Sequence, residues 1–373
     1  MNLEKELKFF YVSISVYNFA TSLVQLFVPL FLFGKGFSIS LILFFYALVQ
    51  IGRLAALPVS AYLSSLYGAK KMISTAFVLQ IIAFYFLGQV NSLSGYFYIS
   101  ALVYGSVWAF LWLPYLVHVS KISSNENRGK IIGKINIYST IASSFGPFLG
   151  GVAIAGFGFS STFALAILLT IPAIYILLLT PEASKIRKIN YSLVSIRKIY
   201  LDIIANGFYN LQNFTNSIFW VIFIFLIVPE YKTIGSMQTA ALLVSIIGFY
   251  FIGVWTDKFN RIKMLAIGSV LNSIAGLSRV LVSSFSGVFL INIISTSTNT
   301  LEAIPWNVKL QEHMDQDART EYMAIFEIGG TIITLIGLLI LAILFSSMPV
   351  KESLVLGLII ASVSGLFVNF VRK

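Results

Sequence analysis

The sequence predicts an all-α, polytopic membrane protein whose twelve transmembrane helices form two six-helix pseudo-symmetric halves. Three observations predict this fold: an excess of apolar residues, a regular succession of apolar stretches, and an uneven distribution of basic residues. Apolar residues make up 58% of the 373 residues, charged residues make up 10%, and the mean hydropathy is +0.90. Soluble domains are about 45–50% apolar and about 25% charged. A chain this apolar would expose large apolar patches in water, whereas a bilayer accepts them.

An apolar stretch of about 20 residues is long enough to cross the hydrocarbon core of a membrane as a helix. We predict spans at 9–33, 39–66, 72–91, 95–119, 131–155, 160–180, 201–228, 234–256, 262–284, 286–308, 322–346 and 352–370. The first span is too long for a cleaved signal, lacks a small-residue cleavage site and carries Asn18, Thr21 and Gln25. We therefore expect it to be retained.

The basic residues predict the orientation of these spans. With twelve spans, 20 of the 25 Lys and Arg residues fall on the side of both termini, three fall on the other side, and Arg53 and Arg279 lie within spans. Because cytoplasmic loops carry the excess of Lys and Arg, we predict a multi-pass plasma-membrane protein with both termini in the cytoplasm. The same asymmetry accounts for the net charge of +11 without a nucleic-acid partner.

An internal repeat divides the chain into two halves. The ends of the second and eighth spans resemble each other, Pro114 matches Pro305, and Arg128 matches Arg319, all at a spacing of about 191 residues. Equivalent spans are therefore six apart, which is typical of transporters with a substrate site between two repeats. We predict an N-terminal half at 1–180, a basic cytoplasmic linker at 181–200 and a C-terminal half at 201–373.

Two motifs fall at defined places in these halves. After the eighth span, the chain carries Gly253, Asp257, Arg261 and Lys263, with Asn260 where a glycine is expected; the copy after the second span is eroded. The fifth span carries a glycine motif made of Gly133, Ala142, Gly146, Pro147, Gly150 and Gly151. In these motifs the sequence resembles the major facilitator superfamily, and the resemblance extends over the whole chain. The glycine motif resembles that of the drug/proton antiporters of this family.

The resemblance implies a conformational latch between the halves. In this family span 8 neighbours span 5, so Asp257 is expected to dock on the positive end of the span-5 helix, near 129–133, and to hold the outward-facing state. Arg261 and Lys263 would hold Asp257 or bind headgroups. The Gly146, Pro147, Gly150 and Gly151 stretch would let span 5 bend and pack closely, with or without a role in coupling.

The resemblance also implies that spans 1, 4, 7 and 10 line a central cavity. Helical spacing independently gives each of these spans a polar or aromatic face. From these faces we predict the following substrate-binding residues: Asn18, Gln25, Trp108, Trp112, Asn206, Asn210, Asn213, Asn299 and Glu302. Hydrogen bonding in the bundle interior is the alternative role for the amides.

Ionisable residues within spans are functional candidates. Glu302 can bind a proton or a cationic substrate, or else pair with a Lys or Arg. Spans 2 and 11 pack together in the family, so Arg53 and Glu327 can form a switchable pair. We predict Glu302, Glu327 and Arg53 as the proton-coupling residues. Arg279 is expected to snorkel toward the membrane surface.

These features favour a secondary transporter, working as a monomer in lipid, that exports amphipathic or cationic small molecules in exchange for protons. The alternative is an uptake permease for a sugar or organic anion, which is favoured by the span-7 asparagines and by the lack of an Arg before Gly105 in span 4. The sequence has no Cys and two His, and no motif of an intramembrane protease or prenyl-transfer enzyme. We therefore expect no metal, no cofactor and no enzyme activity.

Overall fold

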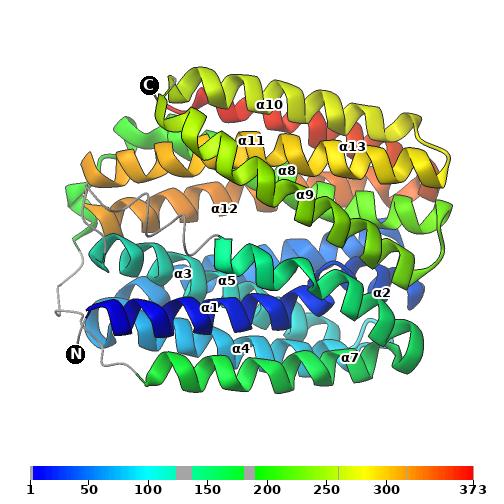
Figure 1. Ribbon diagram of the computed structural model, residues 1–373, viewed down its shortest axis with the longest axis horizontal. Coiled ribbons are helices and arrows are strands. Elements are labelled where there is room, and N and C mark those ends of the chain that lie inside the picture. Colours follow the sequence, from blue (N-terminus) through cyan, green and yellow to red (C-terminus); the bar gives the residue numbers. More distant parts are fainter. Residues whose placement is uncertain (1–2, 123–136, 180–189, 259, 317, 373) are drawn as a thin grey trace.

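The computed structural model describes residues 3–122, 137–179, 190–258, 260–316 and 318–372. They form an elongated bundle of helices that run along its long axis (Figure 1). Both termini lie at one end of the bundle, on the left of Figure 1, which we call the terminal face; the opposite end is the distal face.

The N-terminal half crosses the bundle six times. It contains α1 (Leu3–Gln25), α2 (Val28–Gly34), α3 (Ile39–Tyr67), α4 (Ala69–Gly88), α5 (Gly95–Ile122), a helical segment at 137–144 and α7 (Gly146–Leu178). The stretch Ile137–Leu178 has 42 residues, which at 1.5 Å per residue is about twice the bilayer thickness. Inside it, Gly158 has a φ of +79°, a conformation that side chains disfavour. The fifth and sixth crossings meet at this kink.

The C-terminal half repeats the pattern. It contains α8 (Ile196–Ile227), α9 (Tyr231–Lys258), α10 (Arg261–Ser278), α11 (Phe285–Gln316), α12 (Arg319–Leu344) and α13 (Val350–Ser364). Short 3₁₀ helices accompany them in the described residues: η1 (Tyr191–Leu193), η2 (Arg279–Leu281), η3 (Phe345–Ser347) and η4 (Gly365–Phe370). Since α8 begins at Ile196, its first turn lies inside the linker predicted at 181–200.

The twelve predicted crossings agree with these helices. Within the described residues, nine helical stretches are long and apolar enough to span a membrane by composition; α1 and α2 count as one, and Ile137–Leu178 counts once although Gly158 divides it. The helices α9 and α11 are not among the nine, but with 28 and 32 residues both exceed the about 20 residues that a span needs. The fold is therefore the predicted all-α membrane bundle of twelve helices.

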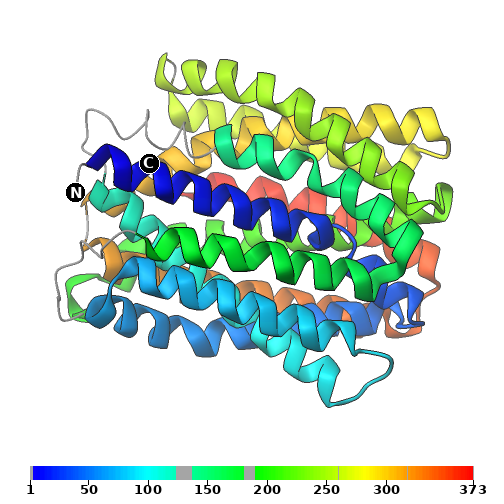
Figure 2. The same ribbon diagram turned by 60° about the horizontal axis from the view of Figure 1, so that its bottom comes forward.

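The two halves meet along two helix pairs. Helices α1 to α7 pack mainly on one another, as do α8 to α13, while α3 packs on α12 and α7 packs on α9 across the boundary (Figures 1 and 2). One apolar cluster near the distal face and another near the terminal face each contain residues of both halves. Large apolar side chains such as Phe157 and Ile343 are 78% and 74% exposed, as expected for surfaces that face lipid.

Candidate functional site

A buried ion pair joins the two halves. Arg53 lies midway along α3, and its Nη2 atom contacts Oε2 of Glu327, which lies two turns into α12. The two side chains are 5% and 3% exposed, so water screens neither charge. The structure thus brings together the two residues that the sequence suggested as a switchable pair.

Close packing of α3 on α5 sets the orientation of Arg53. A Cβ atom at Gly52 would overlap the backbone of Leu102, and a Cβ atom at Gly105 would overlap the carbonyl of Val49. The two helices therefore touch through their backbones, as small residues permit in membranes. With this face of α3 held against α5, Arg53 is presented to α12.

Several polar groups beside the ion pair lack a hydrogen-bond partner among the described residues. They are both amide atoms of Gln50, Nε of Arg53 and Oγ1 of Thr331. Gln50 lies one turn before Arg53, Thr331 lies one turn after Glu327, and both side chains are fully buried. An unsatisfied buried polar group costs about 1–3 kcal/mol. A second arrangement that satisfied these groups would therefore compete with the one observed.

Glu302 lies within the C-terminal half, where neutral amides surround it. Its Oε2 atom accepts hydrogen bonds from Nδ2 of Asn272 on α10, at 2.5 Å, and from Nε2 of Gln212 on α8, at 3.4 Å. Thr298 donates to Oδ1 of Asn272 at 3.3 Å and extends this network. Glu302 is fully buried, and its Oε1 atom has no partner in the described part of the chain. No Lys or Arg there forms an ion pair with it.

The predicted polar face of α11 divides between two environments. Asn292 and Ser295 are buried, whereas Asn299, which was predicted on the same face, is exposed. Nearer the terminal face, the Trp306 ring lies 5.2 Å from Tyr209 and 6.2 Å from Phe326, measured between ring centroids. The structure does not place Asn299 in the network of Glu302.

The amides of α8 bind neighbouring groups of the same half. Asn206 donates to the carbonyl of Phe326 on α12 at 3.3 Å, and Asn210 donates to Oδ1 of Asn206 at 3.1 Å. Asn213 donates to the carbonyl of Tyr209, one turn earlier, at 2.9 Å. Asn206 is buried, while Asn210 and Asn213 are half-buried. The side chains of Asn210 and Asn213 thus keep part of their surface accessible.

The predicted residues of spans 1 and 4 are less deeply placed. Asn18 is half-buried in α1, and Gln25 is exposed at its last position, where α1 breaks before α2. Trp108 and Trp112 on α5 are half-buried, and Trp112 stacks on Tyr115 with ring centroids 5.7 Å apart. These side chains make no hydrogen bond to the Glu302 network.

The glycine motif forms tight contacts on two sides of α7. Cβ atoms at Gly146 and Gly150 would overlap Ser22 and Leu23 of α1, and a Cβ at Gly151 would overlap the carbonyl of Tyr231 on α9. From the other side, a Cβ at Gly235 of α9 would overlap the carbonyl of Pro147. The motif therefore carries the close contact between α7 and α9 across the halves.

The loop motif is described in part. Asn260, where the family has a glycine, caps α10: its Oδ1 atom accepts from the backbone N–H groups of Ile262 and Lys263 at 3.0 and 3.1 Å. Arg261 pairs with Glu312 of α11, and Lys263 is exposed. Gly253 lies in α9. The docking of the Asp257 side chain on 129–133 lies outside the described residues and stays a prediction.

Arg279 is buried rather than snorkelling. Its Nε atom donates to Oγ of Ser295 on α11 at 3.2 Å, and its Nη1 atom donates to Oδ1 of Asn216 on α8 at 3.0 Å. The guanidinium also lies over the ring of Trp220, with 4.8 Å from Cζ to the centroid. The long side chain points inward because these partners are available between α8 and α11.

A further buried acid, Asp202 of α8, was not singled out from the sequence. Near the terminal face it accepts from the hydroxyl of Tyr322 and the backbone N–H of Arg372, both at 3.0 Å. It also lies 2.8 Å from Nε of Arg372 and 3.1 Å from Nδ1 of His313. An acid within a predicted span was the available signal. Asp202 joins α8, α11, α12 and the C-terminal segment, which indicates a structural role.

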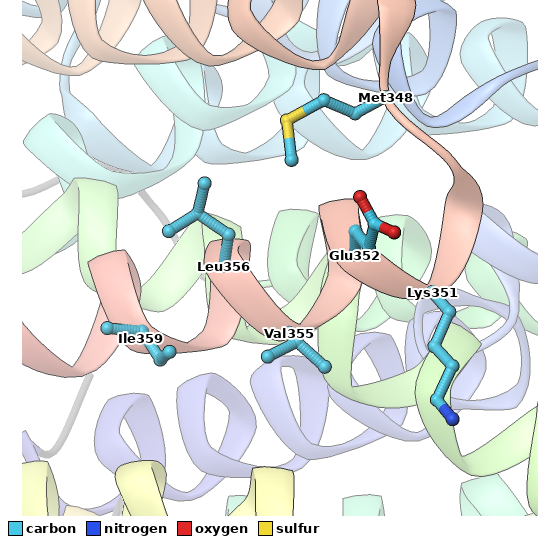
Figure 3. A pocket seen from close by; sticks show the side chains of 6 residues that line it. All are labelled: Met348, Lys351, Glu352, Val355, Leu356 and Ile359. Atoms are coloured by element: carbon cyan, nitrogen blue, oxygen red, sulfur yellow. The ribbon is translucent and has the colours of Figure 1, made fainter.

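A separate groove follows the first turns of α13 near the distal face. It has a volume of about 490 Å³, and Met348, Lys351, Glu352, Val355, Leu356 and Ile359 line it. Figure 3 shows Met348 and Leu356 facing the same space, with the ammonium of Lys351 directed away from it. None of the predicted site residues lines this groove. Within the described residues, no group of three His, Cys, Asp or Glu side chains is placed to hold a metal ion.

Comparison with known proteins agrees with this architecture. The sequence model of the Major Facilitator Superfamily matches residues 10–229 and 208–373. The fold is similar to the crystal structure of a D-xylose-proton symporter, with a TM-score of 0.72 and 14% sequence identity over 99% of this chain and 97% of that one. No curated protein sequence matches the chain significantly.

Proposed function

The chain belongs to the major facilitator superfamily, and we propose that it is a proton-coupled secondary transporter that moves a small polar molecule by alternating access. Members of this family are transporters rather than enzymes. The observation that carries the proposal is the ion pair between Arg53 and Glu327, because it is buried and crosses the boundary between the halves that must move.

Protonation of Glu327 would remove one charge of the pair. Arg53 would then be a buried cation without a counter-ion, and breaking a buried pair in this way costs about 3–5 kcal/mol. Gln50, one turn away on α3, has an unpartnered carbonyl oxygen that can accept from Arg53 in the second state. Protonation would thus replace the ion pair between the halves by a hydrogen bond within the N-terminal half. Because the link between the halves is lost, this change favours separation of α3 from α12.

A polar metabolite suits the C-terminal half. Amide and hydroxyl groups of α8, α10 and α11 lie in the interior of this half, and Arg279 contributes a positive charge there. The similarity to a D-xylose-proton symporter is compatible with proton-driven uptake of such a molecule. Export of amphipathic cations is the second candidate, favoured by Glu302, whose carboxylate has no cationic partner among the described residues.

The membrane orientation and the latch belong to the same proposal. The basic residues on the side of the termini favour a cytoplasmic terminal face in the plasma membrane. Asp257 would dock on the start of the fifth span in the outward-facing state, at the end of α9 opposite to the tight contact of Gly235 with Pro147. We propose that the protein works as a monomer with bilayer lipids around its apolar surface.

Transport by purified protein in liposomes tests the coupling. The substrates are radiolabelled sugars, organic acids and cationic dyes, offered with and without an imposed pH gradient. We expect the wild-type protein to concentrate a substrate only when the gradient is present. The double variant R53Q/E327Q, which removes both charges and leaves neither alone, should exchange that substrate downhill without concentrating it. The proposal would be contradicted if the wild-type protein accumulated substrate equally with and without the pH gradient. Accumulation by the double variant at the wild-type rate would contradict it too.

A further inference from the structure

Arg279 occupies an unusual position for a cation. It begins η2, directly after α10, and its side chain enters the space between α8 and α11 and is 9% exposed. Ser295 is ten residues into α11 from the distal face, which corresponds to a depth of about 15 Å. The guanidinium therefore lies in the interior of the bundle, in the part nearer the distal face. The helices around it correspond to spans 7, 9 and 10.

Among the described residues, no carboxylate forms an ion pair with Arg279. Both hydrogen-bond partners of Arg279, Asn216 and Ser295, are neutral, and none of the ion pairs among the described residues includes it. Glu302 lies on the same helix as Ser295, but seven residues further along, about 10 Å away along the axis. It is bound by Asn272 and Gln212 instead. A buried charge without a counter-ion is costly, so such residues mark ligand sites in membranes.

Arg279 also keeps donors available. A guanidinium has five N–H donors, and two of them are used, one to Ser295 and one to Asn216. Its Nη2 amino group makes no hydrogen bond to the described residues, yet it is not among their buried atoms without a partner. Nη2 therefore keeps some accessible surface, at which the oxygens of a ligand can contact it.

The surroundings of the free donors are fixed. The Trp220 ring under the guanidinium donates from Nε1 to Oδ1 of Asn292 at 3.0 Å. Asn292 in turn donates to the Met237 carbonyl and to Oε1 of Gln238 on α9, both at 3.3 Å. Since the ring cannot rotate without breaking these bonds, Arg279 has an aromatic wall on one side and a preset direction for its fork of donors.

We propose that Arg279, with Asn216 and Trp220, binds the oxyanion group of the transported substrate, a carboxylate or a phosphate. The site rests on the proposed transport function and identifies its substrate as an anionic metabolite. An oxyanion accepts two parallel N–H bonds from a guanidinium, which a neutral hydroxyl cannot do. The ligand would also supply the counter-ion that the protein lacks at this position.

Ligand-induced stabilisation of the purified protein in detergent tests this site without any gradient. Thermal unfolding is followed during titration with sodium benzoate, sodium phosphate or neutral sorbitol, at ionic strength held constant with sodium chloride. We expect benzoate or phosphate to stabilise the wild-type protein in a saturable manner, and the more effective probe identifies the group. Sorbitol should have no effect up to the same concentrations.

The variant R279Q should lose about tenfold or more in apparent affinity for that probe, and N216A should lose less. R279K keeps the charge and serves where R279Q fails to fold; it should bind more weakly because a single ammonium replaces the fork. R197Q, at an exposed arginine in the first turn of α8 near the terminal face, should bind like the wild type. Absence of saturable binding by both anions, or equal binding by R279Q, would overturn the proposal. Because no pH gradient is involved, such a result would leave proton coupling unaffected.

Discussion

Arg53 on α3 and Glu327 on α12 form a buried ion pair between the two halves of the bundle. If the pair holds the halves together, neutralising one partner leaves the other charge buried and alone. We expect R53Q and E327Q each to destabilise the folded protein by about 3–5 kcal/mol. The double variant should lose less than the sum of the two, since it leaves no lone charge. Thermal unfolding of the four proteins in detergent measures the cycle. Additive losses would mean that the charges do not interact.

The resemblance to the family predicted this pair, because spans 2 and 11 pack together there, and the family's glycine motif predicted the close packing at Gly146 to Gly151. The sequence did not predict the surroundings of Glu302. Periodicity shows which residues share a face of α11, but not which helix covers each part of that face: α8, α9 and α10 bury Asn292 and Glu302, while Asn299 remains exposed. Partners that are distant in sequence decide the difference.

The same limit applies to Arg279 and Asp202. Snorkelling was expected of Arg279 because its position near the end of a span is all that the sequence provides, whereas its acceptors come from α8 and α11. Asp202 binds the backbone of Arg372, which is 170 residues away in sequence. Contacts of this kind depend on how the six helices of a half are arranged, and no local pattern encodes them.

Single-cysteine labelling tests the proposed orientation. The chain has no native Cys, so each introduced thiol reports alone. Leu93, in the distal connection between α4 and α5, is 50% exposed, and Asn190 is exposed near the terminal face. In intact cells we expect a membrane-impermeant maleimide to label L93C and to label N190C only after permeabilisation. Equal labelling of both from outside would contradict a topology with cytoplasmic termini.

The contact between Gly235 and Pro147 leaves no space for a side chain. We expect G235A to reduce the transport rate while the protein still inserts and folds, because its Cβ would push α9 away from α7 at about 1–3 kcal/mol of overpacking. G156A is a matched control on α7, since no atom lies within 4 Å of the added Cβ. Proteoliposome transport compares the two. Normal turnover in G235A would show that this contact tolerates separation and does not control the conformational change.

The proposed latch predicts that D257N folds normally but turns over more slowly. Its neutral amide loses the attraction of a carboxylate to the start of a helix, worth about 0.3–2 kcal/mol, which shifts a balanced equilibrium between outward and inward states. Distances between spin labels on the two halves report the populations. As a control, E352Q removes an exposed carboxylate at the distal face and should change neither populations nor rate. Populations in D257N that equal those of the wild type would rule out the latch.

Glu302 is the second candidate for proton coupling, and its environment makes the test sharp. Its carboxylate is fully buried and held by the amide groups of Asn272 and Gln212, and no Lys or Arg in the described part of the chain pairs with it. A proton or a cationic substrate can therefore neutralise it. E302Q has nearly the same shape and keeps an oxygen that can accept from Asn272. We therefore expect it to fold and to behave as a permanently neutral form. It should abolish accumulation driven by a pH gradient, while downhill exchange of a neutral substrate continues.

N307A provides the matched control for E302Q, because Asn307 is exposed on the same helix and its side chain donates to the carbonyl of Ala303, one turn earlier. Two rates decide the outcome, uphill uptake under a pH gradient and exchange without one. A loss of the first with the second retained assigns a coupling role to Glu302. If E302Q concentrates substrate at the rate of N307A and of the wild type, the role of the carboxylate is structural, because a neutral amide of the same shape then supports the same uphill transport. Coupling would then be assigned to Glu327, which is the nearest alternative because its charge already joins the two moving halves.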